Sequence, residues 1–237
     1  MNDAVAGCPF CGMPLQLLDK AISARCMICG ERGRARTWCT KGHFVCGPCA
    51  ASETMAMLHE LLRQPLSDDP VELFLRLRAT GDNPMHGPCH HTLVAAAFLL
   101  AYHHRHGEPS WSAIVETLQT AAEQLPGGTC GFWGCCAAGL SLGMAYCAIL
   151  NSAPTSGPER AMAHQLVAEI TRRIGEFRAP RCCRRECLIA LQTACELSER
   201  LLPKALPTTH RVPCDQADEN EECIDGACPF FQTSDEV

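Results

Sequence analysis

Nineteen cysteines in a chain of 237 residues constrain this protein more than any other feature. A high cysteine content indicates disulfides, metal sites or redox chemistry, and the cellular compartment decides among them. The sequence does not open with a basic segment followed by an apolar stretch, so we expect no secretory signal and a cytoplasmic location. The odd number of cysteines also excludes complete pairing as disulfides. We therefore predict metal binding or thiol chemistry in a reducing compartment.

The composition predicts a mainly α-helical protein. Hydrophobic residues make up 47% of the chain, charged residues 19% and aromatic residues 5%, with Ala, Leu and Cys abundant. We expect a zinc-binding module over residues 1–50 and a helical, cysteine-rich core domain over 51–237. The core domain ends in an irregular, metal-binding tail over 203–237. The net charge of −6 argues against broad nucleic-acid binding, which generally needs a basic face.

Apolar spacing predicts the helices of the core domain. After helical patterns within 50–78, we expect five helices, at 91–105, 110–125, 136–151, 158–176 and 184–202. Residues 130–150 are apolar enough to suggest a membrane span, but their glycines and cysteines favour a buried core helix. Within that helix Gly139, Gly143 and Cys147 recur every four residues, a pattern that lets a second backbone approach closely.

Four ordered groups of metal-binding residues lie within the first fifty residues. Cysteine pairs of the C-x2-C type with a following glycine suit zinc, and eight ligands make two complete tetrahedral sites. The predicted ligands are Cys8, Cys11, Cys26, Cys29, Cys39, His43, Cys46 and Cys49. The groups pair either sequentially or as a cross-brace, as in RING-type modules. Both schemes give closed sites, which predicts a structural or interaction role rather than catalysis.

Several core cysteines stand at predicted helix starts. Cys136 opens the helix at 136–151, and Cys182 and Cys183 open the helix at 184–202. Free backbone N–H groups and the helix dipole lower the pKa of a thiol there and favour a thiolate. We therefore predict that these thiols, together with Cys130, bind a cofactor or react. His90 and His91 open the helix at 91–105, and we expect the three helix starts to meet at one pocket.

Four segments together resemble an uncharacterised cysteine-rich domain family. The segments are GPCHHTLVAAAFLLAY, GGTCGFWGCCAAG, PRCCRREC and ECIDGACPF. This family occurs in anaerobic archaea and bacteria, often beside or fused to radical-SAM proteins, and the resemblance covers roughly residues 35–231. It implies anaerobic metabolism, iron–sulfur chemistry and work with a radical-SAM partner. Cys89 departs from the family pattern, in which glutamate precedes the His-His pair, and Cys135 has no counterpart there.

The leading functional hypothesis is an iron–sulfur protein acting in redox or sulfur-transfer chemistry on a small or sulfur-containing substrate. A [4Fe–4S] cluster would be held by Cys130, Cys136, one of Cys182/Cys183 and one of Cys223/Cys228. The candidate catalytic residues are two histidines for acid–base work or ligation, and two arginines that neutralise an anion: His90, His91, Arg181 and Arg184. The alternatives are a thiol redox or sulfur-carrier protein without a core cluster, and a zinc-stabilised adaptor without enzymatic activity.

Overall fold

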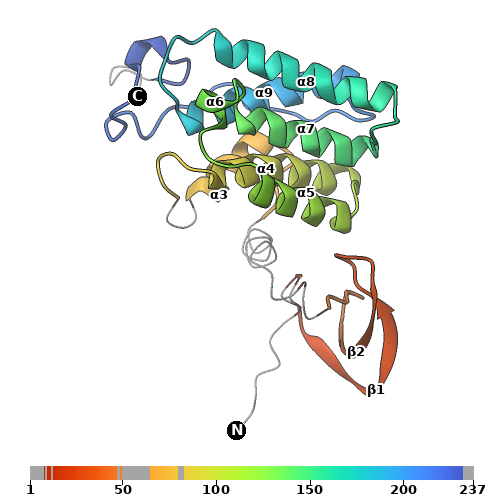
Figure 1. Ribbon diagram of the computed structural model, residues 1–237. Coiled ribbons are helices and arrows are strands. Elements are labelled where there is room, and N and C mark those ends of the chain that lie inside the picture. The colour runs from red at the N-terminus through yellow and green to blue at the C-terminus, as the bar shows by residue number, and fades with distance from the viewer. Residues whose placement is uncertain are drawn as a thin grey trace.

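The computed structural model describes residues 8, 10–11, 13–46, 49, 65–79 and 83–231. Within these residues the chain forms a β-hairpin, a bundle of helices and a C-terminal tail with little regular structure (Figure 1). The hairpin projects from the bundle on the side where α4 and α5 lie. The mainly helical fold with a small metal module is therefore confirmed, whereas the helical patterns predicted within 50–64 lie outside the described residues.

The hairpin carries the N-terminal metal-binding residues. Its strands, β1 (Leu15–Arg25) and β2 (Arg32–Cys39), pair antiparallel with Arg25 opposite Arg32 and Leu15 opposite Cys39. The turn between them contains Cys29 and Gly30, and Gly30 has a φ of +73°, a conformation that glycine adopts without strain. The pairing brings the cysteines at both ends of the hairpin toward residues of the loop that follows β2.

The helices of the bundle start and end where caps and breakers predict. The five predicted helices are confirmed to within two residues at each end. The helices are α3 (Pro70–Ala79), α4 (Cys89–His106), α5 (Trp111–Gln124), the short α6 (Thr129–Phe132), α7 (Ala137–Leu150), α8 (Pro158–Gly175) and α9 (Cys183–Leu201). Ser110 caps α5 by accepting a hydrogen bond from the backbone N–H of Ala113, and Pro158 occupies the first turn of α8.

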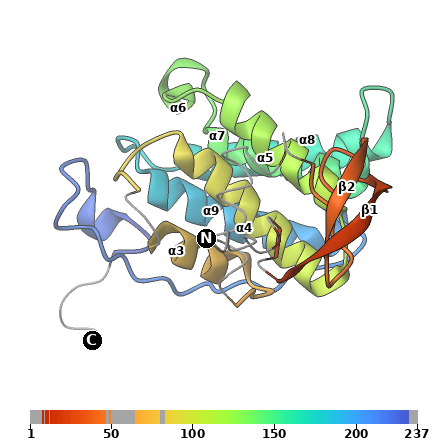
Figure 2. The ribbon, with the colours of Figure 1, turned by 90° about the horizontal axis from the view of Figure 1, so that it is seen from below.

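Helix α4 forms the centre of the bundle. Every residue from His90 to Tyr102 is buried, so this helix is covered on all sides rather than on one stripe. Figure 2 shows α3, α5, α7 and α9 arranged around it. The surrounding helices contribute the large buried side chains Phe74, Ile114, Leu118 and Tyr146, which complete the core.

The small-residue stripe of α7 brings α8 close. A Cβ atom on Gly139 would lie 3.0 Å from Cγ2 of Ile170, and one on Gly143 would lie 2.5 Å from Cγ2 of Val167. Both glycines are therefore required by close packing, as the spacing predicts. The apolar run at 130–150 contains α6 and the buried helix α7, and no helix of the described residues is long and apolar enough to cross a membrane.

The tail after α9 folds back along the bundle without regular elements except a 3-10 turn at Asp225–Ala227. Leu206, Val212 and Phe230 are buried against the core. Arg184 at the start of α9 pairs with Asp215 at 2.6 Å and donates a hydrogen bond to the carbonyl of Pro213 at 2.9 Å. These contacts fix the tail next to the N-terminal end of α9.

Candidate metal centres and thiol pocket

Two groups of four residues in the hairpin module can each hold a metal ion. Within each group the ligand atoms all lie within 4.8 Å of one another. The first group is Cys8, Cys11, Cys39 and His43, and the second is Cys26, Cys29, Cys46 and Cys49. In sequence order, the Cys8/Cys11 pair therefore shares a site with Cys39 and His43, and the Cys26/Cys29 pair shares a site with Cys46 and Cys49. This is the cross-brace arrangement, one of the two that the sequence allows.

The first site combines three thiols and one imidazole. The Nδ1 atom of His43 lies 3.1 Å from Sγ of Cys11 and 3.6 Å from Sγ of Cys39. Burial raises the pKa of Cys8 to about 11. The backbone N–H of Lys41 lies 3.3 Å from Sγ of Cys39, so a backbone donor already points at one ligand sulfur, as in cysteine knuckles around tetrahedral metals.

The second site consists of four thiols and is less enclosed, because Cys29 is exposed. Sγ of Cys29 lies 3.8 Å from Sγ of Cys46, and the backbone N–H of Cys46 lies 3.4 Å from Sγ of Cys26. Burial acts to raise the pKa of Cys26, but N–H groups of Cys46, Cys29 and Ile28 outweigh it and lower the pKa to about 7. The site thus stabilises a thiolate, the form that ligates metal.

A half-open cavity of about 530 Å³ lies where α6, the start of α7 and the start of α9 come together. Cys130, Cys135 and Cys136 line it, together with side chains of opposite charge at its other wall. Cys183 is not among the residues that line the cavity, but it is near enough to Cys130 and Cys136 to affect them electrostatically. We call Cys130, Cys136 and Cys183 the pocket thiols.

Burial decides the protonation of the pocket thiols. Cys136 and Cys183 stand at the starts of α7 and α9, where we predicted lowered pKa values. That prediction is wrong: burial raises the pKa of Cys183 to about 11, although a hydrogen bond from the backbone N–H of Gly87 opposes it. Burial and the nearby carboxylate of Glu186 raise the pKa of Cys136 well above its usual range. The cost of removing a thiolate from water exceeds the benefit of the helix dipole.

The adjacent cysteines 182 and 183 belong to different surroundings. Cys182 occupies the position just before α9 and is buried. Burial raises its pKa, and the neighbouring Cys228 and Cys214 raise it further. The amide of Asn220 lies 3.8 Å from its sulfur. Cys214, Cys228 and Cys182 therefore form a second group, the tail thiols. Cys223 lies nearby in sequence, and its sulfur accepts a hydrogen bond from the N–H of Asp225 at 3.4 Å.

The two candidate histidines lie inside the bundle at the start of α4. Arg78 donates from Nε to Nε2 of His90 at 3.2 Å, so Nδ1 of His90 carries the proton and donates to the carbonyl of Gly87 at 3.1 Å. Burial lowers the pKa of His90 to about 4. Both nitrogens of His90 are thus engaged, whereas His91 uses Nδ1 on the carbonyl of Leu125 and keeps Nε2 for another partner.

The two candidate arginines differ in position. Arg181 lines the cavity, and its side chain lies 3.6 Å from Glu222. Arg184 is buried and engaged with the tail, so its role in the structure is to hold residues 213–215. Sequence reasoning gave no role to Glu186, which is buried and lines the cavity. The sequence could have pointed to Glu186, because it follows Cys183 by three residues and therefore lies on the same side of α9.

Arg185 also lines this cavity and is buried. Its guanidinium lies 3.8 Å from the carboxylate of Glu186, donates to the carbonyl of Pro180 at 2.7 Å and lies over the ring of Phe177 at 5.8 Å. The cavity therefore combines three kinds of group: soft sulfur donors, one buried carboxylate and a fixed positive charge.

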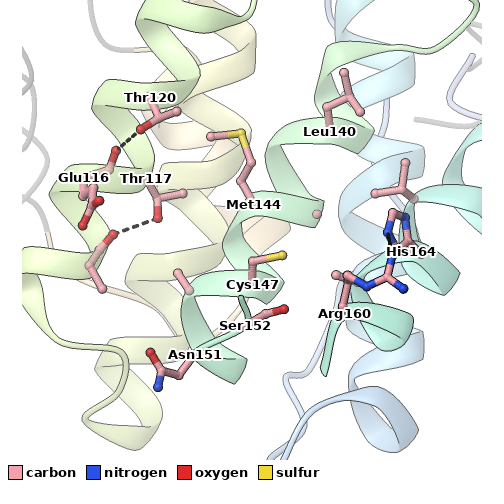
Figure 3. Close-up of a pocket in the computed structure, with 15 residues that line it drawn as sticks. Glu116, Thr117, Thr120, Leu140, Met144, Cys147, Asn151, Ser152, Arg160 and His164 are labelled. Carbon is pink, nitrogen blue, oxygen red and sulfur yellow. Dashed lines mark hydrogen bonds between the residues drawn. The ribbon is translucent and has the colours of Figure 1, made fainter. Parts of the chain in front are cut away.

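A second cavity, of about 620 Å³, lies between α5, α7 and α8 (Figure 3). Figure 3 shows Thr117 and Thr120 on one side and Arg160 and His164 on the other. Both threonine hydroxyls donate to carbonyls of their own helix at 2.8 Å, as the dashed lines mark. Cys147, which continues the small-residue stripe of α7, is the one cysteine among the described residues that line this groove, so no group of thiols gathers there.

The fold and these clusters define a cysteine-rich, mainly helical protein with a cross-brace module that can bind two metal ions. A family model described as a family of unknown function (DUF5714) matches residues 58–231, and the chain belongs to that family. The matched region contains the bundle, the pocket thiols and the tail thiols, but not the hairpin. The searches of curated proteins and of solved structures gave no significant match.

Proposed function

We propose that this protein is a metalloprotein of anaerobic metabolism with two kinds of metal site. Zinc in the two hairpin sites would stabilise the N-terminal module. An iron–sulfur cluster on the pocket thiols would act in redox or sulfur-transfer chemistry in the helical domain. The observation that carries the proposal is that Cys130 and Cys136 line one half-open cavity, with Cys183 at the start of α9 near enough to act electrostatically on both.

Zinc suits the hairpin sites because each offers four sulfur or nitrogen donors with no oxygen donor among them. Three thiols with one imidazole, and four thiols, are the ligand sets of structural zinc. Neither site leaves a position for a substrate. Zinc would therefore contribute folding free energy to a hairpin that has few buried side chains of its own.

The pocket thiols suit an iron–sulfur cluster in chemistry and in placement. Thiolates are the usual ligands of such clusters, and hydrogen bonds and nearby charge tune their potential. When bound, the cluster would supply one-electron chemistry and, with three protein ligands, an iron open to a substrate. The backbone N–H of Gly87 donates toward Cys183, and the fixed charge of Arg185 offsets negative charge in the cavity.

The residues around the pocket thiols favour a small anionic substrate. Arg181 lines the cavity, is half exposed and lies 3.6 Å from Glu222, so it can also meet a ligand, whereas the buried Arg185 is fixed by Pro180 and Glu186. The resemblance to proteins found beside radical-SAM enzymes supports a role in such a pathway, with a radical-SAM protein as partner. Cys182, Cys223 and Cys228, also predicted as cluster ligands, lie on the tail side and are not needed for a three-thiol site.

A thiol redox or sulfur-carrier protein is the second candidate. It is favoured by the adjacent thiols Cys135 and Cys136, both of which line the cavity. It is weakened by the raised pKa values of Cys136 and Cys183, because a carrier thiol has to form a thiolate readily. The first candidate needs thiolates as well, but there the bound iron displaces the thiol protons.

The test is anaerobic purification followed by analysis of iron, sulfide and zinc, together with the visible spectrum. We expect the broad visible absorption of an iron–sulfur cluster and two zinc ions per chain, one for each hairpin site. The variants Cys130→Ser, Cys136→Ser and Cys183→Ser should each lose most of the iron and keep both zinc ions. Colourless wild-type protein with two zinc ions would favour the second candidate.

Cys147→Ser is the matched control, because Cys147 is a partly buried thiol in the groove between α7 and α8, away from the cavity. It should keep iron and zinc at wild-type levels. Cys182→Ser tests the choice within the adjacent pair and should keep the iron as well. Unchanged iron in a Cys130→Ala/Cys136→Ala double variant would contradict the ligand assignment.

A further inference from the structure

One face of the hairpin concentrates positive charge. Along β2 the residues alternate between a covered and an open face, and Arg32, Arg34 and Arg36 are all exposed on the open one. Arg25 lies directly opposite Arg32 in the strand pairing and is also exposed. We call these four arginines the hairpin patch. Trp38, two residues beyond Arg36, continues the same face and is partly exposed.

The hairpin patch is unbalanced by negative charge within the described part of the chain. None of its four arginines forms an ion pair or side-chain hydrogen bond there. Like charges directly opposite each other on a sheet destabilise it, and Arg25 and Arg32 are such a pair. An anion that lies across both strands would reduce the repulsion between these arginines.

The metal sites add negative charge to the module but leave Arg32, Arg34 and Arg36 exposed on one face of β2. With two divalent ions bound, seven thiolates and one imidazole would contribute about −3. Cys39 of the first site belongs to the covered face of β2 and is buried, whereas Cys26 and Cys29 of the second site lie in the turn between Arg25 and Arg32. The total of −6 for the chain therefore conceals a local basic surface.

We propose that the hairpin patch binds a single-stranded nucleic acid, with its arginines on successive phosphates and Trp38 stacking on a base. Alternate side chains on a strand lie about 7 Å apart, a spacing comparable to that of phosphates along an extended single strand. A basic track combined with an aromatic ring is how proteins bind single strands without reading their sequence. The proposal uses neither the pocket thiols nor their cofactor.

The full-length, metal-loaded protein is tested by fluorescence anisotropy with labelled single-stranded RNA and DNA of mixed sequence, about 16 nucleotides long. Salt is varied from about 50 to 200 mM. We expect binding that weakens as salt rises. The double variant Arg32→Gln/Arg34→Gln should reduce the affinity about tenfold or more at low salt. It should also flatten the slope of log K against log salt by about 1.4, the effect of two lost phosphate contacts.

The matched control is Lys204→Gln/Arg211→Gln, which removes the same charge from two exposed residues of the tail. It should bind like the wild type. Trp38→Leu should weaken binding roughly fivefold or more while leaving the salt slope unchanged. Zinc analysis of every variant, with two ions expected, separates loss of binding from loss of the fold.

Three outcomes would overturn the proposal. The first is absence of salt-dependent binding to both RNA and DNA. The second is an equal loss of affinity in the tail control. The third is selective binding of polyglutamate, or of vesicles containing phosphatidylserine, in place of the oligonucleotides, which would assign the patch to an acidic protein or to a membrane surface.

Discussion

The ring of Phe10 meets the ring of Trp111 edge-on, with centroids 4.5 Å apart and an angle of 75° between the ring planes. Phe10 lies between two ligands of the first metal site, and its ring also meets the imidazole of His43 at 4.9 Å. Trp111 is the first residue of α5 and lies 4.3 Å from His103 of α4. A row of four rings thus connects a metal ligand with the helical bundle.

Metal removal should therefore change the surroundings of Trp111. In a Trp38→Phe/Trp133→Phe background, Trp111 is the only tryptophan of the three in the chain. A chelator should shift its emission to longer wavelength, because loss of the metal releases Phe10 and admits water. Phe10→Ala should give the shifted emission before chelation. Emission that responds to neither change would show that the module and the bundle are not coupled through these rings.

The cross-brace pairing predicts which double variants lose one metal and which lose two. Cys11 and His43 share a site, whereas Cys11 and Cys29 belong to different sites. Cys11→Ser/His43→Ala should therefore keep about one zinc ion per chain, and Cys11→Ser/Cys29→Ser should keep none. Zinc analysis of the purified variants decides the matter. Sequential pairing would give the reverse result for the two variants.

Gly143→Ala should destabilise the bundle despite the better helix propensity of alanine. The new methyl group would lie 2.5 Å from Cγ2 of Val167, so α7 and α8 would have to move apart. Overpacking of this kind costs about 1–3 kcal/mol, measured by urea unfolding. Gly143→Ala/Val167→Ala should recover part of the loss. Gly175→Ala, with no atom within 4 Å of the new methyl group, is the control and should be close to neutral.

Stability should fall as the pH is lowered, because His90 is buried in its neutral form. Burial lowers its pKa from 6.5 to about 4, so between these values the unfolded chain binds a proton that the folded chain does not. The contribution of His90 is thus complete above pH 6.5 and is lost as the pH falls toward 4. Between pH 7.5 and 5.5 the loss is about 1.3 kcal/mol.

The measurement compares urea unfolding of the wild type and His90→Gln at the two pH values. The glutamine variant is less stable at both, but the decrease between them should be smaller by the contribution of His90. An identical decrease in both proteins would mean that His90 does not remain neutral in the fold.

The sequence by itself determined the local elements. Helices α4, α5, α7, α8 and α9 follow from apolar spacing, a serine cap and proline positions, all of which act within a few residues along the chain. The eight hairpin ligands were also predictable, because knuckle cysteines recur at short, fixed spacings. The close approach of α7 and α8 was visible as glycines four residues apart.

Only the tertiary structure decided which distant residues meet. The sequence left two pairings for the hairpin ligands open, and the choice depends on how β1 and β2 place groups more than ten residues apart. The separation of Cys182 from Cys183 depends on the path of the tail, which Arg184 and Asp215 fix. Burial, which no local pattern measures, reversed the expected pKa shift of the thiols at the helix starts.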